Sequence, residues 1–457
     1  MCIVSRLLTT IHYIEDPDSL RFALSMVEFD ITRLQPHFPG YVVFVALARM
    51  FTSTAGSFAV AFSLVGGVAT FLLITGMLRL LRWHMLSGRG IVLTLVMLTN
   101  GMLWIYGNRY MPDLLGTSML VWAIGDLARG TQKENIRGAF VAGLLAGTRL
   151  SYLPFLIPAG IVAIQWRTGR LKSILAFTIG VALWASSLIA STGWTNLIEI
   201  GKNQTAGHFD EFGGTIRTEP DVLHRASSMA EGLWTDALGG YAVNRSLITI
   251  VAGIGVVVSI VLSMQGLIAW LRTRHARIVV AGIVAYFVWI FLFQNVIYHS
   301  RHLLPIVPFV LVLVAYGLHQ LATMNRIATA GAAVLACSMS LVGVTLAFQH
   351  QKPSAIAQVR QHLGDSSAMI TVVSTGLVNS YLASTGVRAR FLNVESDNVR
   401  DSLRADSTSA AIVSVGDYRS LVKRPIEFVR HFFHNPHVNR IWPHIEVYEY
   451  ARADSLR

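Results

Sequence analysis

Cysteine and charged residues are scarce in this 457-residue chain, and each scarcity excludes a class of protein. The two cysteines, Cys2 and Cys337, lie far apart, and Cys337 falls within an apolar run. This spacing excludes a disulfide framework and a thiolate metal site. Only 14% of the residues are charged, whereas soluble globular domains contain about 25%, so the composition excludes an ordinary soluble domain.

Long apolar runs are what the chain has in abundance, and 53% of its residues are hydrophobic. A spanning helix needs about 20 apolar residues. We expect spans at 57–81, 89–106, 113–129, 171–191, 246–271, 278–297, 302–321 and 326–348. The stretch 137–166 is interrupted at Arg149, Ser151 and Pro154, which predicts two short helices meeting at the outer surface. The stretch 40–52 predicts a short or re-entrant helix.

The formal net charge of +12 is concentrated in short connectors between apolar runs. This distribution argues against a nucleic-acid partner, which would require a continuous basic stripe. Lysine and arginine gather near 79–89, 129–137, 167–172, 272–277 and 326. By the positive-inside rule these connectors are cytoplasmic. The alternating connectors, and everything after residue 349, are therefore expected on the external side of the membrane.

Two domains are predicted. Residues 1–349 form a polytopic membrane domain, although 1–13 are too short to span, so we expect its first helix to be truncated or its start mis-assigned. Residues 350–457 form a small extracytoplasmic α/β domain with a mainly parallel sheet, because amphipathic stretches alternate with short apolar strands. The amphipathic stretches are 354–363, 377–384, 397–404 and 424–434. The strands are 369–375, 389–394, 410–415 and 445–450.

The segment Glu15-Asp16-Pro17-Asp18 is an acidic, proline-broken loop just ahead of the apolar helices. Carboxylates this close to a bilayer cost free energy and are candidates for function. Asp16 and Asp18 can hold a divalent cation such as Mg²⁺ or Mn²⁺ through oxygen ligands, or one of them can act as a general base. Capping of a helix that begins near Ser19 explains the same pattern, and the residues alone leave both interpretations open.

Further polar motifs fall at predicted outer helix ends or in outer loops. They contribute His37 and Tyr41 (PHFPGY), Asp113 (PDLL), Arg149 (GTR), His208 (GHFDEFGG), and His299, Arg301 and His302 (HSRHLLP). For the two arginines the alternative is interfacial snorkelling. His37, His299 and His302 could bind a metal, but their spacing matches no zinc motif, so the alternative is that they are hydrogen-bonded surface histidines. The segment around His208 suits either a mobile loop over a sugar site or an ordered interfacial loop.

Taken in order, the acidic loop, PHFPGY, PDLL, GTR and RHLLPIVP resemble the GT-C superfamily of integral-membrane glycosyltransferases. The nearest groups are bacterial relatives of the protein O-mannosyltransferases and the aminoarabinose transferase acting on lipid A. The resemblance covers roughly 10–350. It implies a polyprenyl-phosphate sugar donor, inversion at the anomeric carbon and an active site at the external face. The acceptor, whether a glycan, a lipid or a protein, stays open.

The resemblance also implies roles for individual residues. Asp16 or Asp18 matches the first-loop acid that activates the acceptor, and we favour Asp18 as the base. Asp113 matches the second-loop acid. Arg149 and Arg301 match the cationic groups that hold the lipid-linked phosphate, where guanidinium donors stabilise a leaving anion. Substrate binding is expected of His37, Tyr41, His208, His299 and His302.

Two rival classes predict other arrangements. A secondary transporter or lipid flippase places ionisable groups near the bilayer midplane and often has repeated halves. Here the predicted spans are almost uncharged, and no repeat is visible. A non-catalytic scaffold predicts that Asp16, Asp18, Asp113, Arg149 and Arg301 do not converge in space.

Overall fold

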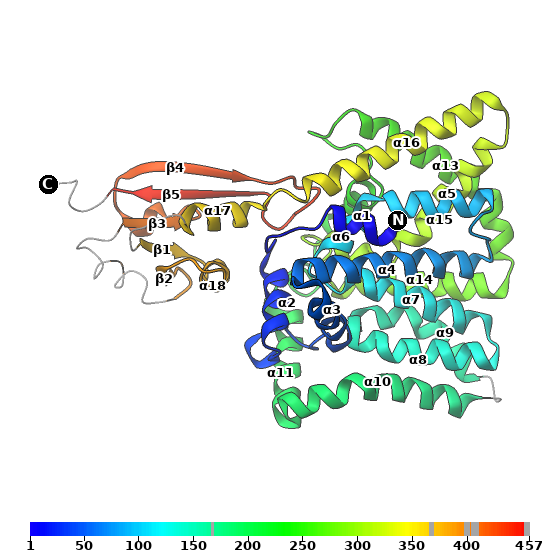
Figure 1. Cartoon of the computed structure of the whole chain (residues 1–457), viewed down its shortest axis with the longest axis horizontal. Coiled ribbons are helices and arrows are strands. Elements are labelled where there is room, and N and C mark those ends of the chain that lie inside the picture. Colours follow the sequence, from blue (N-terminus) through cyan, green and yellow to red (C-terminus); the bar gives the residue numbers. More distant parts are fainter. Residues whose placement is uncertain (166–168, 365–369, 397–402, 404–410, 452–457) are drawn as a thin grey trace. The chain divides into compact units, whose positions relative to one another are not determined.

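The computed structural model describes residues 1–165, 169–364, 370–396, 403 and 411–451, and it divides the chain into two compact units (Figure 1). The membrane unit comprises Met1–Thr10 and Arg21–Phe348. The sheet unit comprises Ile11–Leu20 and Gln349–Arg457. The acidic segment at 15–18 therefore belongs to the sheet unit, a placement that the sequence did not predict.

Among the described residues, six helical stretches are long and apolar enough to cross a membrane. They are α4 (Phe58–Leu81), the stretch Gln132–Gln165, α10 (Arg170–Thr192), α13 (Ile248–Leu271), α14 (Arg274–Phe293) and α16 (Arg326–Gln349). The pair α5 (Gly88–Thr99) and α6 (Gly101–Asn108), bent by 55°, makes a seventh if it is one span. Asn100 marks the bend, where its side chain accepts the Leu103 N–H and caps α6. The multi-pass helical fold predicted from the sequence is confirmed.

Outside the stretch 132–165, the other described helices before residue 350 are shorter than these spans. They are α1 (Cys2–Leu8), α2 (Pro17–Val27), η1 (Ile31–Arg33), α3 (Val42–Ala55), α7 (Asp113–Arg129), α11 (Trp194–Ala206), η3 (Gly207–Glu211), α12 (Val222–Glu231), η4 (Gly232–Ala237), η5 (Ser300–Leu303) and α15 (Val307–Ala322). Helix α15 begins five residues later than the span expected at 302–321. Pro308 occupies its first turn, where proline costs no hydrogen bond and favours a helix start.

The interrupted stretch 137–166 contains two helices joined by a tighter turn. Helix α8 (Gln132–Arg149) is followed by the 3₁₀ turn η2 (Leu150–Leu156) and by α9 (Ile157–Gln165). Pro154 lies inside η2, where its missing N–H disfavours an uninterrupted α-helix. The turn therefore leaves Arg149 at the end of α8, as the break in the sequence predicts.

Helices α7 and α8 are antiparallel neighbours with an ion-pair group at each end. At one end the buried carboxylate of Asp126 pairs with Arg79 of α4 and with Arg137 of α8, whose Nη2 lies 2.8 Å from Asp126 Oδ1. At the other end Asp113 begins α7 and Arg149 ends α8. The basic connectors of the sequence thus gather at one end of this helix pair, and the candidate site residues lie at the other.

Helices α8 and α10 approach each other through two glycines. A Cβ added to Gly143 would lie 2.4 Å from the Phe177 carbonyl oxygen and 2.9 Å from Gly180 Cα. Small residues of this kind let membrane helices pack backbone to backbone.

We expect Gly143→Ala to lower the free energy of unfolding by roughly 1–3 kcal/mol, because the added methyl group forces the two helices apart. The matched control is Gly160→Ala in α9, where an added Cβ meets no atom within 4 Å among the described residues. Thermal unfolding in detergent measures both variants. Equal midpoints for the two would contradict the close approach of α8 and α10.

The sheet unit contains one five-stranded sheet (Figure 1). Its strands are β1 (Ile370–Ser374), β2 (Ala389–Asn393), β3 (Ala411–Val415), β4 (Ile426–Phe433) and β5 (His444–Tyr450), in the order β2-β1-β3-β5-β4. Its helices after the acidic segment are α17 (Ala355–Gly364), α18 (Gly376–Ser384) and α20 (Arg419–Val422). Strand β1 is parallel to β2 and β3, whereas β5 is antiparallel to β3 and β4.

Two expectations for this unit are wrong. The stretch 424–434, expected as an amphipathic helix, forms strand β4, because its β-branched and aromatic residues pair along β5. The sheet is consequently mixed rather than mainly parallel. The four expected strands are present within one residue of their predicted bounds. Apart from Leu403, the stretch expected at 397–404 lies outside the described residues.

Candidate functional site

Arg149 lies at the centre of a buried polar group in the membrane unit. Its Nη2 is 3.1 Å from Asp113 Oδ1, and its Nη1 donates to the Tyr41 hydroxyl at 3.1 Å. Tyr152, in the turn after α8, donates its hydroxyl to the same carboxylate at 3.3 Å. All four side chains are less than a tenth exposed. We call Tyr41, Asp113, Arg149 and Tyr152 the Arg149 cluster.

Local sequence explains why these residues meet. Asp113 is the first residue of α7, where the helix dipole favours a carboxylate. Gly116 follows one turn later, and a Cβ there would lie 2.8 Å from Arg149 Cβ and 3.1 Å from Tyr152 Cε2. Glycine at 116 therefore lets α7 approach the end of α8 closely enough for the ion pair to form.

The PHFPGY motif forms one wall of the cluster. The Tyr41 hydroxyl lies 2.9 Å from His37 Nε2, and Phe22 of α2 packs edge-on against both rings. Tyr41 caps α3 with a left-handed backbone, φ 47°. A bulky residue in this conformation costs about 1–3 kcal/mol, and such strain is concentrated at functional sites. The backbone of Tyr41 thus marks the cluster independently of its hydrogen bonds.

The RHLLP motif forms the other wall. Arg301 Nη1 lies 3.5 Å from the Met111 sulfur, two residues before Asp113. The His302 carbonyl accepts a hydrogen bond from the Tyr286 hydroxyl at 2.9 Å. Tyr286 in turn packs edge-on against Tyr152, with ring centroids 5.8 Å apart. Tyr286 therefore connects the turn at 300–303 to the Arg149 cluster.

The electrostatics of His302 show that the positive groups converge. Burial, followed by the charges of Arg301 and Arg149 and the nearby imidazoles of His299 and His208, holds the pKa of His302 well below its usual value. His208 itself hydrogen-bonds to the Phe293 carbonyl through Nε2 at 2.7 Å. Arg149, Arg301, His208 and His299 therefore all act on His302, and a group of positive and imidazole side chains of this kind can hold an anion.

We expect His302 to make the stability of the chain depend on pH. Its pKa is lower in the folded state than the unfolded value of about 6.5, so the unfolded chain binds more protons at acidic pH. Stability is therefore full above about pH 6.5 and falls below it, by at most about 1.4 kcal/mol per pH unit. His302→Gln should flatten this slope in thermal unfolding measured at pH 7.5, 6.5 and 5.5. Identical slopes for the variant and the parent chain would contradict the expectation.

The acidic segment is fixed within the sheet unit. Glu15 is buried, and its Oε2 lies 3.0 Å from His350 Nε2. The Tyr381 hydroxyl donates to the Ile14 carbonyl at 2.5 Å, and burial, followed by the charges of Asp16 and Glu15, raises the pKa of Tyr381. These contacts tie the segment 11–20 to His350 and to α18 of its own unit.

Asp16 and Asp18 differ in their surroundings. Asp16 is buried, and its Oδ1 accepts the Ser19 N–H at 2.7 Å, so the helix-capping contact considered from the sequence is present. Asp18 is half-buried in the first turn of α2. The catalytic and metal-binding roles of both aspartates stay predictions.

The structure thus gathers several predicted site residues in one region of the membrane unit. They are His37, Tyr41, Asp113, Arg149, His208, His299, Arg301 and His302. Tyr152, Tyr286 and Gly116 were missed. Tyr152 could have been predicted from the sequence, because it follows Arg149 within the interrupted stretch. Tyr286 could not, because it is a single polar side chain in an apolar run.

No family model and no curated protein matches the sequence. Among solved structures, the chain is similar to ArnT from Cupriavidus metallidurans bound to undecaprenyl phosphate. The two share 12% sequence identity and a TM-score of 0.56, over 98% of this chain and 96% of that protein. The apo state of ArnT gives 12% identity and a TM-score of 0.53, over 99% and 96%. This likeness concerns the fold, and the predicted multi-pass helical architecture with a small C-terminal α/β domain is confirmed.

Proposed function

We propose that this chain, on the fold it shares with ArnT, is a membrane glycosyltransferase that uses a polyprenyl-phosphate sugar donor. The sugar would pass, with inversion, to an extracytoplasmic acceptor. The observation that carries the proposal is the convergence of Arg149, Arg301 and three histidines at one end of the helices. The fold adds support, because the neighbouring structure is ArnT with undecaprenyl phosphate bound.

The chemistry of the leaving group fits this arrangement. Breaking the bond between the sugar and its carrier leaves negative charge on a lipid phosphate. Arg149 directs two nitrogens to Asp113 and Tyr41, while its buried Nε has no hydrogen-bond partner among the described residues. Charge–charge attraction is stronger in such a buried site than in water. Arg149 and Arg301 would therefore hold the phosphate and stabilise it as it departs.

Asp113 and Asp18 would have separate roles. Asp113 is buried and paired with Arg149, so it would position the guanidinium group. Asp18 is the proposed general base, the role that the resemblance to GT-C enzymes gives to an acid of the first loop. Asp16 would orient the loop. With Asp18 it would also supply oxygen ligands to Mg²⁺ or Mn²⁺ if transfer requires a divalent cation.

The proposed function also implies the membrane and the orientation of the chain. The chain would reside in the bacterial inner membrane with its basic connectors in the cytoplasm. Both the Arg149 cluster and the sheet unit would then face the extracytoplasmic side. Protease treatment of intact spheroplasts tests this orientation, since cleavage within 350–457 is expected without permeabilisation. Protection of that region until the membrane is opened would overturn it.

Turnover of a labelled donor tests the function. The full chain, purified into lipid nanodiscs, would be given a panel of labelled polyprenyl-phosphate sugars, and release of free polyprenyl phosphate would be measured. We expect release with at least one donor, dependent on an added acceptor. Movement of intact lipid-linked sugar across vesicles without release would instead support the flippase alternative. EDTA treatment in the same assay tests the need for a divalent cation.

A further inference from the structure

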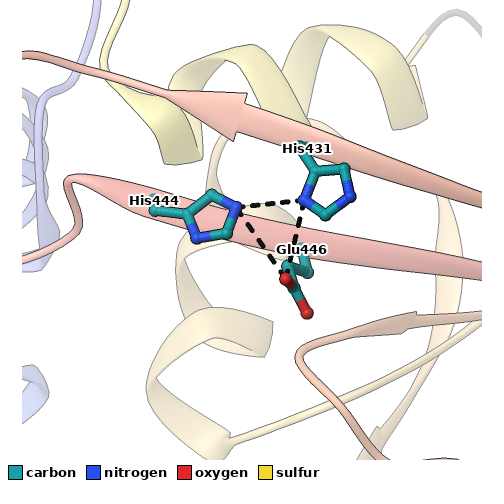
Figure 2. A group of neighbouring side chains, drawn as sticks. All are labelled: His431, His444 and Glu446. Carbon is teal, nitrogen blue, oxygen red and sulfur yellow. Dashed lines mark hydrogen bonds and ion pairs between the residues drawn. The ribbon is translucent and has the colours of Figure 1, made fainter.

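Two histidines and a glutamate meet on the exposed surface of the sheet unit (Figure 2). His431 Nδ1 lies 3.2 Å from His444 Nε2 and 3.5 Å from Glu446 Oε1. His444 Nε2 lies 4.0 Å from the same carboxylate oxygen. One ligand atom from each residue is thus directed to a common point.

The pairing of the strands explains the meeting. In the antiparallel pair β4–β5, His431 is opposite Glu446 and Phe433 is opposite His444. Alternate residues of a strand share a face, so all four side chains lie on one side of the sheet. Strand β4 is an edge strand, and most of its residues are exposed. The group therefore lies on an open surface of the sheet unit, whereas the Arg149 cluster belongs to the membrane unit.

The distances match those of a metal coordination shell. Zinc bound tetrahedrally at 2.0–2.1 Å from nitrogen and oxygen requires its ligand atoms to be ~3.4 Å apart. Two of the three observed separations, 3.2 and 3.5 Å, lie close to this value, and the third is 4.0 Å. For all three atoms to bind one tetrahedral ion, the third separation must shorten by about 0.6 Å.

Neighbouring side chains hold two of the ligands in place. The Tyr448 hydroxyl donates to Glu446 Oε2 at 2.6 Å, which leaves Oε1 directed toward the imidazoles. Phe433 stacks on His444, with ring centroids 4.4 Å apart and planes within 5°. Such outer contacts orient ligands in metal sites.

We propose that His431, His444 and Glu446 form a binding site for a divalent transition-metal ion of the zinc class. Two imidazole nitrogens and one carboxylate oxygen suit Zn²⁺, with Cu²⁺ and Ni²⁺ as competitors, rather than Mg²⁺ or Ca²⁺. Three protein ligands leave a fourth position for water or an anionic oxygen donor. The site is independent of the proposed glycosyl transfer.

Calorimetric titration with Zn²⁺ alone tests the site. The full-length chain would be used in detergent after removal of any affinity tag, because a histidine tag binds the same ion. We expect one Zn²⁺ per chain at pH 7.5. His444→Ala should reduce the affinity by more than roughly 10-fold. The matched control is His12→Ala, which removes an exposed histidine of the same unit outside the cluster.

Glu446→Gln provides a second variant that keeps an oxygen acceptor for Tyr448, and it should also weaken Zn²⁺ binding. Substitution with Co²⁺ adds a spectroscopic readout, since tetrahedral coordination gives intense visible absorption that the variants should lose. The proposal is overturned if the parent chain binds no Zn²⁺ at micromolar concentration. It is also overturned if His444→Ala and Glu446→Gln bind Zn²⁺ as tightly as the parent chain does. The three residues would then be only a hydrogen-bonded surface group.

Discussion

Arg149→Met is expected to abolish transfer and to lower the free energy of unfolding by roughly 3–5 kcal/mol, because it leaves the buried Asp113 carboxylate without its cation. The double variant Arg149→Met/Asp113→Asn removes both charges and should recover most of the lost stability. The amide oxygen introduced at position 113 can still accept the Tyr152 hydrogen bond. Transfer should nevertheless remain absent in the double variant, because no guanidinium is present at position 149 to hold the phosphate.

Thermal unfolding and the donor-release assay, applied to the same preparations, separate the two effects. The control is Asp113→Asn alone, which keeps the arginine but removes its partner. Recovery of both stability and transfer in the double variant would show that the ion pair is only structural, and the proposed role of Arg149 would fail.

Asp18→Asn is expected to reduce transfer by about 10²–10⁴-fold, the usual contribution of a general base. The amide keeps the shape of the side chain but does not take up the acceptor proton. Asp16→Asn should also reduce transfer severely, and since asparagine caps helices as well as aspartate does, its effect is not explained by loss of the cap. Donor binding should be retained in both variants.

Glu15→Gln is the matched control in the same loop. Glu15 is buried against His350, so the substitution should lower stability, while transfer per folded molecule stays closer to normal. Release of polyprenyl phosphate in membranes with matched expression measures all three variants. Full turnover in both aspartate variants would remove this loop from the catalytic centre and leave its residues a structural role.

Much of the fold was predictable because apolar length and strand composition are local properties of the chain. The runs that became α4, α10, α13 and α16 are apolar and long enough to cross a bilayer, and this length can be read directly from the sequence. The helix predicted at 424–434 was wrong because a short amphipathic pattern with β-branched and aromatic residues is compatible with either a helix or an edge strand. Pairing with β5, which lies later in the sequence, decided between the two.

The candidate site was predictable only in part. Alternating charge in the connectors predicted that Asp113 and Arg149 lie on the same side of the membrane, and the structure joins them at 3.1 Å. The contribution of Gly116 depends on how closely two helices pack, which no local pattern encodes. The placement of the acidic segment depends on contacts such as that between Glu15 and His350, 335 residues apart. Such long-range pairs are invisible to motif spacing.

Binding of undecaprenyl phosphate to the full chain tests the central claim most directly, because it requires no knowledge of the sugar or the acceptor. Native mass spectrometry would compare this lipid with neutral undecaprenol, for the parent chain and for Arg301→Gln. Arg326→Gln, an exposed arginine at the start of α16, is the control. The account predicts a clear preference for the phosphate that Arg301→Gln loses and Arg326→Gln keeps. Equal binding of the two lipids, or an unchanged preference in Arg301→Gln, would contradict it.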